Sequence, residues 1–169
     1  LMVAELTRAL LQRQIETRPE TLVGLLGCRS AAEVQARREE LCRTAYECGL
    51  YHDLGKCAVL MYIDNNARRL LDEEFFCIQS HPRTGADILN RMGCGRTLAL
   101  AALYHHCYYN GKGGYPNDAP SCPEEIKGIV DALSVADSLD AATDNIGRCY
   151  NLAKPFRTLL EELRAQSGT

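Results

Sequence analysis

The sequence predicts an all-α fold in a single domain. Apolar residues recur every three to four positions almost everywhere, which is the period of an amphipathic helix. No alternating strand pattern, internal repeat or low-complexity tract interrupts this pattern. A chain of 169 residues suits one domain, because a domain of this size buries roughly 70% of the surface that its extended chain exposes. We therefore expect one helical domain over residues 1–169.

The first part of the chain is expected to form two long helices joined by a loop. Apolar residues at helical spacing stripe the first helix: Val3, Leu6, Leu10, Leu11 and Ile15. A loop or short turn follows at residues 24–30. A similar stripe marks the second helix: Val34, Leu41, Ala45 and Cys48. This second helix leads directly into His52 and Asp53.

Turn and breaker residues divide the rest of the chain into further helices. Pro82, at a first-turn position, opens a helix over residues 83–92 with His81 at its entrance. Another helix is expected over residues 97–108, followed by a turn-rich segment at 110–123. Glu124 and Glu125 then lie at the positive end of the next helix. With a last helix over residues 155–164, we expect a bundle of about six to seven helices.

Composition and charge narrow the functional classes. The net charge of −3 disfavours long nucleic acid as a partner, because tracking a phosphate backbone requires a basic face. No apolar run approaches the roughly 20 residues of a membrane span, and the charged residues near the start do not fit a signal peptide. The nine cysteines follow neither a disulfide framework nor a CxxC zinc pattern. Reduced thiols and a cytoplasmic location are therefore expected.

The four histidines lie in three short clusters: His52-Asp53, His81 and His105-His106. Each cluster falls beside a turn or helix end. A lone histidine at such a position is more often a solvated helix-end residue. Four histidines at such positions, one of them next to an aspartate, favour metal binding. Imidazole nitrogens with carboxylate oxygens suit Mn, Fe, Zn or Ni, and Asp53 could bridge two ions. The sequence therefore predicts a site for two metals.

Two further motifs extend this site. Lys56 follows Asp53 by three residues, where it could reach a phosphate held by the metals. Asp137 and Asp140 share one side of an otherwise apolar helix. Because burying an unpaired charge is costly, Asp137 is predicted to be a metal ligand, whereas Asp140 is expected to have a structural role. Cys107, which directly follows His106, is expected to pack or line the site and not to bind metal, because this chemistry prefers N and O donors.

These motifs resemble the HD-GYP family, the cyclic-dinucleotide phosphodiesterase branch of the HD-domain metal phosphohydrolases. The resemblance covers nearly the whole chain in the family's order. The matching elements are His52-Asp53-Leu54-Gly55-Lys56, His81-Pro82 with Gly85-Ala86-Asp87-Ile88-Leu89, His105-His106, Asn110-Gly111 with Gly114-Tyr115-Pro116, and Val135-Ala136-Asp137 with Asp140-Ala141-Ala142-Thr143. Five ordered elements are far more specific than a lone His-Asp pair.

The resemblance implies a helical HD-domain bundle around a multinuclear centre of divalent metals. The ligands of one ion would be His52, Asp53 and Asp137. The ligands of the other would be Asp53 as a bridge, His81, His105 and His106. Fe or Mn are the expected metals, with Zn, Ni and Mg as alternatives. Some members of the family bind a third metal through a histidine that would lie just upstream of Leu1.

The resemblance also implies roles in catalysis. Asp53 and Lys56 would be catalytic. Lys56 would contact phosphate oxygens as a point charge, and Arg148 would contact them as a bidentate donor. Gly114 and Tyr115 would lie at the substrate, with Tyr115 shaping the loop. The substrate would be cyclic di-GMP or a related cyclic dinucleotide, opened to the linear dinucleotide or cleaved further to mononucleotides. An upstream sensor domain, a signalling partner and self-association are all compatible with the family.

The chain departs from the family pattern near this site. Cys107 and Asn110 replace acidic residues, the turn before Tyr115 is one residue longer, and Asn151 replaces a second cation after Arg148. Two alternatives therefore stay open: a cyclic-nucleotide-sensing or protein-interaction module, and an HD phosphohydrolase of another phosphoester. The retention of the histidines and of the ligand aspartates favours an enzyme.

Overall fold

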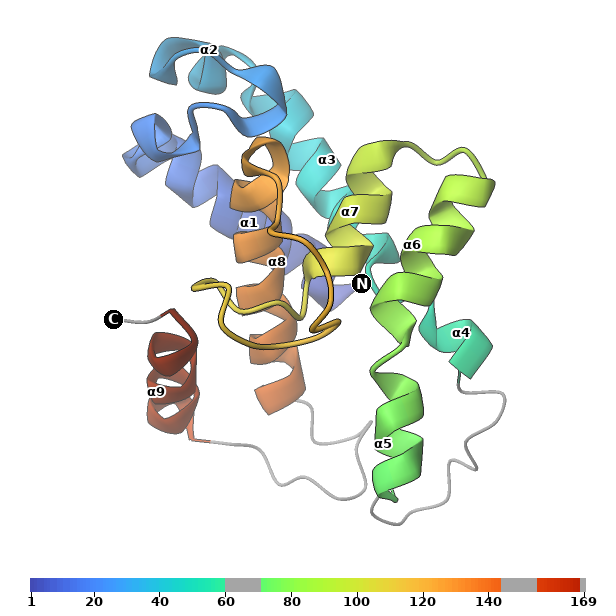
Figure 1. The fold of residues 1–169 in the computed structure, drawn as a ribbon. Helices are drawn as coiled ribbons and strands as arrows, with labels where there is room; N and C mark the ends of the chain where they lie inside the picture. The colour runs from blue at the N-terminus through green and yellow to red at the C-terminus, as the bar shows by residue number, and fades with distance from the viewer. Residues whose placement is uncertain (60–70, 144–154, 168–169) are drawn as a thin grey trace.

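The computed structural model describes residues 1–59, 71–143 and 155–167, and its regular secondary structure is helical, which confirms the predicted all-α class (Figure 1). The helices are α1 (Met2–Thr17), α2 (Ala31–Ala36), α3 (Arg38–Tyr51), α4 (Lys56–Val59), α5 (Asp72–Ile78), α6 (His81–Arg91), α7 (Arg96–Tyr104), α8 (Glu124–Thr143) and α9 (Phe156–Ser167). Two 3-10 helices, Pro19–Leu22 and Leu25–Gly27, precede α2. Among the described residues, the one isolated β-bridge pairs Cys107 with Gly114.

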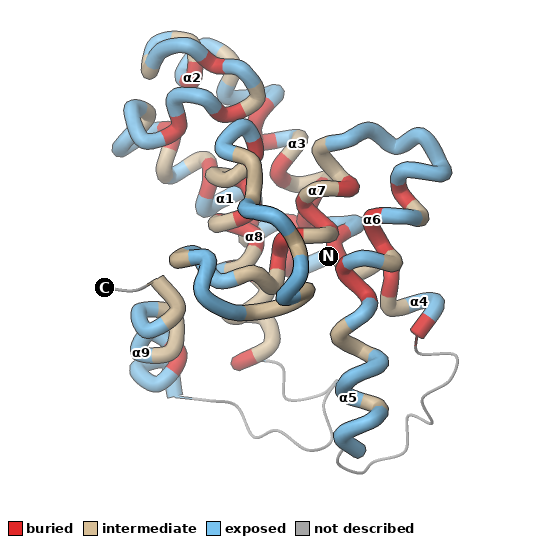
Figure 2. The backbone as a smooth tube through the Cα atoms, in the orientation of Figure 1, coloured by how far each residue is buried: buried red, intermediate tan, exposed pale blue. Residues whose placement is uncertain are grey.

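Helices α1, α3 and α8 pack together at the centre of the bundle (Figure 1). The buried face of α1 has helical spacing: Val3, Ala4, Thr7, Leu11 and Ile15. This is the predicted stripe except at Leu10, which is 37% exposed. The close approach of α3 depends on Gly49, because a Cβ there would lie 2.7 Å from the Cα of Ala4. Burial is concentrated on the facing sides of these helices, whereas α5 has no buried residue (Figure 2).

Helices α6 and α7 form a hairpin beside this centre (Figure 1). Small residues and one leucine fill the space between the two helices: Ala86, Leu89, Ala99 and Ala102. The hairpin turn uses Gly93 and Gly95 at positive φ, 69° and 95°, a conformation that glycine adopts without steric cost. Since His81 begins α6 and His105 directly follows α7, the hairpin brings both histidines to the same end.

The structure corrects two of the predicted helices. The helix expected to run through Val34 to Cys48 is broken at Arg37 (φ −95°, ψ 15°), whose guanidinium donates to the carbonyl of Leu26 at 3.0 Å. The helix expected over residues 97–108 ends at Tyr104. Beyond it, the amide of Tyr108 donates to the carbonyl of Gly113 at 3.0 Å, so the backbone has already entered a turn.

The other expected helices are present with small shifts. The last one is Phe156–Ser167, a little longer than predicted. Among the described residues, six helices have nine or more residues, which agrees with the predicted six to seven: α1, α3, α6, α7, α8 and α9. The short helices α4 and α5 were not predicted. Within the described residues, no helix combines the length and the apolar character needed to cross a membrane.

Candidate metal centre

The ends of three helices and the middle of a fourth deliver the predicted ligands to one place. His52 follows the last residue of α3, and Asp53 lies in the turn after it. His81 is the first residue of α6, and His105 follows α7. Asp137 lies within α8. Residues separated by up to 85 positions in the chain thus converge, because α3 and α8 belong to the central bundle and the α6–α7 hairpin packs beside it.

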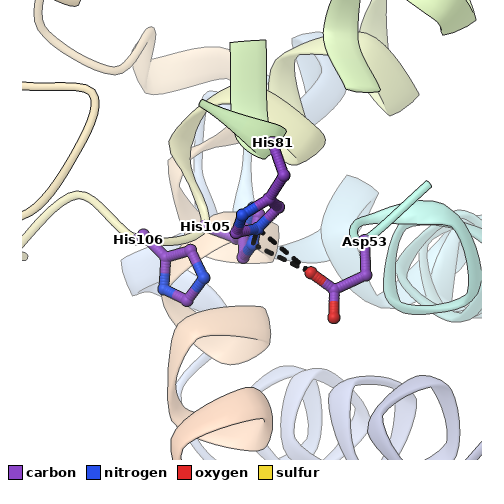
Figure 3. Close-up of side chains that lie close together, drawn as sticks. All are labelled: Asp53, His81, His105 and His106. Carbon is purple, nitrogen blue, oxygen red and sulfur yellow. Dashed lines mark hydrogen bonds and ion pairs between the residues drawn. The ribbon is translucent and has the colours of Figure 1, made fainter. Parts of the chain in front are cut away.

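Asp53 lies between the histidines. Its Oδ1 is 3.1 Å from Nε2 of His81 and 3.7 Å from Nε2 of His105, and Figure 3 shows both rings directed at this oxygen. Its Oδ2 is 3.3 Å from Nε2 of His52. The two oxygens of one carboxylate therefore face different imidazoles, which is the arrangement that a bridging ligand requires.

In the part of the chain that the structure describes, the donor atoms form two groups, each with all of its atoms within 4.8 Å of one another. The first group is Asp53, His81, His105 and His106, the set that the family resemblance implied for one ion. The second group is His52, His105 and Asp137. The resemblance placed Asp53 in this second set and His105 in the first alone. In the structure His105 belongs to both groups, and Asp53 reaches His52 through Oδ2.

Backbone hydrogen bonds orient three of the imidazoles. The Nδ1 atoms of His52, His81 and His105 lie 2.8, 2.6 and 2.7 Å from the carbonyl oxygen three residues earlier in the chain. An Nδ1 that donates to a carbonyl leaves Nε2 to face the site, as is usual for histidine metal ligands.

The facing Nε2 atoms need a positive charge between them. Those of His81 and His105 are only 3.2 Å apart, and two unprotonated nitrogens at that distance present lone pairs to each other. Two buried polar atoms, Nε2 of His52 and Oδ1 of Asp53, also make no hydrogen bond of good geometry. Because buried polar groups are normally paired, these orphaned atoms fit a site built for cations.

The electrostatics of the cluster give most of its donors ligand-competent protonation states. Burial disfavours ionisation of Asp53 and Asp137, yet the neighbouring histidines hold the pKa of both carboxyls well below its usual range. Burial lowers the pKa of His105, and burial together with His105 lowers the pKa of His106 to about 2. Burial would also lower the pKa of His52, but Asp137 and Asp53 raise it to about 9. Near pH 7 the carboxylates are therefore charged and His105 and His106 neutral, as metal ligands require, whereas His52 carries a proton that a bound metal would displace.

Lys56 lies at the edge of this cluster. Its Nζ donates to Oδ2 of Asp53 at 2.5 Å, and its side chain is 29% exposed. The turn that places it packs tightly on α6, since a Cβ at Gly55 would overlap the carbonyl of His81. The absence of a side chain at Gly55 therefore allows the backbone beside Asp53 to reach the start of α6.

The Gly-Tyr-Pro turn covers the other side of the histidines. The ring of Tyr115 lies 4.3 Å from that of His106, and its amide donates to the carbonyl of His106 at 3.2 Å. Gly114 has a φ of 85°, and a Cβ there would overlap the same carbonyl. Cys107 directs Sγ to the carbonyl of Tyr115 at 3.7 Å. The turn therefore rests against a predicted ligand, as expected for a loop that shapes the site.

Two residues with predicted roles, Arg148 and Asn151, fall outside the described residues. Asp140 belongs to neither donor group. No role was predicted for Ser134, whose hydroxyl donates to the backbone carbonyl of His105. The helical spacing of Ser134 and Asp137, one turn apart in α8, was the available signal.

Comparison with known proteins identifies the class. The family model described as HD domain matches residues 21–142, so the chain belongs to the HD domain family. This agrees with the helical bundle and with the clustered histidines and aspartates.

The curated relatives include bacterial cyclic-dinucleotide phosphodiesterases, as the resemblance predicted. A cyclic di-GMP phosphodiesterase of Pseudomonas aeruginosa is 34% identical over 73% of this chain and 30% of its own length. The cyclic di-GMP phosphodiesterase response regulator RpfG of Xanthomonas campestris is 32% identical over 81% of this chain and 35% of its own. The 3'3'-cGAMP-specific phosphodiesterase 2 of Vibrio cholerae is 29% identical over 99% of this chain and 31% of its own. The chain thus spans about a third of the length of these relatives.

Proposed function

We propose that this chain is a metal-dependent phosphodiesterase domain that hydrolyses a cyclic dinucleotide. The observation that carries the proposal is the buried cluster in which Asp53 lies between His52, His81 and His105, with two of the Nε2 atoms 3.2 Å apart. The names of the relatives support the substrate class, since they are phosphodiesterases of cyclic di-GMP or of 3'3'-cGAMP.

The proposed ligands form a centre for two divalent ions. One ion would be held by His52, Asp53 and Asp137, and the other by Asp53 as a bridge, His81, His105 and His106. The two oxygens of Asp53 face different imidazoles, whereas His105 has a single free nitrogen because its Nδ1 contacts the Ala102 carbonyl. The mixture of imidazole and carboxylate donors favours Fe or Mn over Mg, and Zn and Ni also suit it. Metal ions bound there supply an activated water nucleophile and neutralise the charge that develops on the phosphate.

The protein's own side chains would orient the substrate beside this centre. An ammonium group has three donors, and Lys56 uses one on Asp53, so its other N–H groups can meet a phosphate oxygen. This contact places a positive charge where negative charge increases during the reaction, which is where it lowers the barrier most. Tyr115, packed on His106, would close one wall of the site. Arg148 is proposed as a second phosphate contact.

We also propose that the nine cysteines are reduced thiols and that the chain acts in the cytoplasm. An upstream sensor domain or a signalling partner is proposed to accompany it. The dinucleotide itself is the open part of the proposal, because the relatives divide between cyclic di-GMP and 3'3'-cGAMP.

The experiment is product analysis on a panel of substrates. The purified protein, loaded with Mn²⁺ or Fe²⁺, is incubated with cyclic di-GMP, 3'3'-cGAMP, a 2',3'-cyclic mononucleotide and p-nitrophenyl phosphate. We expect a linear dinucleotide from at least one cyclic dinucleotide. This activity should be lost in Asp53→Asn and kept in Asp72→Asn, which neutralises an exposed carboxylate of α5. Turnover of only the mononucleotide or the monoester would instead identify another phosphohydrolase, and binding without turnover would identify a sensing module.

A further inference from the structure

A single side-chain hydrogen bond joins the end of α7 to α8. The hydroxyl of Ser134 donates to the carbonyl of His105 at 2.6 Å, across 29 residues of sequence. Other serine and threonine hydroxyls in the bundle, such as those of Thr7 and Thr44, bond to carbonyls of their own helix. The bond from Ser134 differs because it connects two elements that both carry proposed metal ligands.

The carbonyl of His105 depends on this donor. Helix α7 ends at Tyr104, and the last carbonyls of a helix have no partner within it. Among the described residues, no backbone amide donates to the His105 carbonyl, because the next amides turn elsewhere: that of Cys107 bonds to Tyr104 and that of Tyr108 to Gly113. The hydroxyl of Ser134 therefore satisfies a polar group that would otherwise be unpaired in a part-buried place.

The bonded residue occupies the centre of the site. The side chain of His105 is fully buried, and it belongs to both donor groups. Its own Nδ1 is held by the carbonyl of Ala102, so the ring is fixed relative to the end of α7. Ser134 lies one turn before Asp137, on the same side of α8. The bond thus fixes the backbone at His105 relative to the helix that bears Asp137.

We propose that Ser134 is a positioning residue of the metal centre, holding His105 and Asp137 at the separation that metal binding requires. This inference rests on the proposed metal-dependent function. Contacts that orient a ligand from outside the coordination sphere typically contribute about 10–100-fold to metal affinity. Ser134 itself contacts backbone, so its effect is on the geometry of the ligands.

The test is a metal titration of the metal-free full chain, independent of any substrate. Mn²⁺ affinity is measured for Ser134→Ala, and Co²⁺ is used to record the visible spectrum that reports ligand geometry. Ser134→Thr keeps the hydroxyl, and Ser134→Val has nearly the same shape as threonine but lacks the hydroxyl. Thr44→Ala is the matched control, since the exposed hydroxyl of Thr44 bonds to the Glu40 carbonyl within α3. Unfolding in chelator is recorded for each protein.

We expect Ser134→Ala and Ser134→Val to bind Mn²⁺ about tenfold or more weakly and to alter the Co²⁺ spectrum. Ser134→Thr and Thr44→Ala should match the wild type. If Ser134→Ala fails to fold, the Mn²⁺ affinities of Ser134→Thr and Ser134→Val are compared instead, because these two variants differ only in the hydroxyl. Equal affinities across the series, or equal weakening in Thr and Val, would overturn the positioning role and leave the proposed function intact. A wild type that binds no metal would overturn both.

Discussion

Removal of the charge on Asp53 should disable the whole centre and not only one half of it. This carboxylate faces His81 and His105 through Oδ1 at 3.1 and 3.7 Å, and His52 through Oδ2 at 3.3 Å. Asp53 and His81 belong to the same donor group, but Asp53 also contacts His52 of the other group through Oδ2. Asp53→Asn keeps the shape of the side chain and removes an anionic donor from between the two proposed ions. We therefore expect it to cost more bound metal than His81→Ala.

The size of the effect follows from ligand linkage. At a free metal concentration of 100 times Kd, one bound ion stabilises the folded chain by about 2.7 kcal/mol. For a domain of this length, 1 kcal/mol shifts Tm by roughly 2–4 °C, so each ion should raise Tm by about 5–11 °C. A hundredfold loss of affinity would reduce that contribution to about 0.4 kcal/mol. Asp53→Asn should therefore lose nearly all of the metal-induced rise in Tm.

The assay is calorimetry of each protein with chelator and with Mn²⁺, together with elemental analysis. The difference between the two conditions isolates metal binding from the direct effect of the substitution on folding. Asp72→Asn, on the exposed surface of α5, should retain the full rise. If Asp53→Asn keeps the wild-type metal content and the wild-type rise in Tm, the bridging role is wrong.

Three further predictions concern residues around the ligands. Lys56→Met should keep both ions but lower kcat by about a hundredfold, because one preorganised electrostatic contact is removed; unchanged turnover with both ions in place would show that Lys56 is only a solvated residue. Gly55→Ala should lower the free energy of unfolding by about 1–3 kcal/mol, since its Cβ would overlap the His81 carbonyl, and denaturant titration checks this. Cys107→Ala should leave metal content unchanged, because Sγ faces the carbonyl of Tyr115; lost metal would identify a thiolate ligand.

The sequence was sufficient for the fold class and for the identity of the clustered residues. Helical periodicity predicted the bundle, and His52, Asp53 and Asp137 stood out because histidines and carboxylates beside helix ends are the residue types that metals need. These signals are local, since each can be read within a few residues of sequence. That is why the ordered motifs predicted a common site before any contact was known.

The features that escaped prediction depend on contacts between distant segments. The break at Arg37 is accompanied by a hydrogen bond to Leu26, which no helical periodicity reveals. The end of α7 at Tyr104 depends on the turn that pairs Tyr108 with Gly113. The membership of His105 in both donor groups likewise follows from how α7 meets α8.

The most direct test of the central claim is a titration that compares turnover with bound metal. Metal-free protein receives increasing Mn²⁺, and hydrolysis of the best cyclic dinucleotide is followed alongside the number of ions bound per chain. If two ions act together at one phosphodiester, turnover should remain low with the first ion and rise as the second binds. Full turnover in verified metal-free protein, or a maximum reached at one ion per chain, would contradict a two-metal centre.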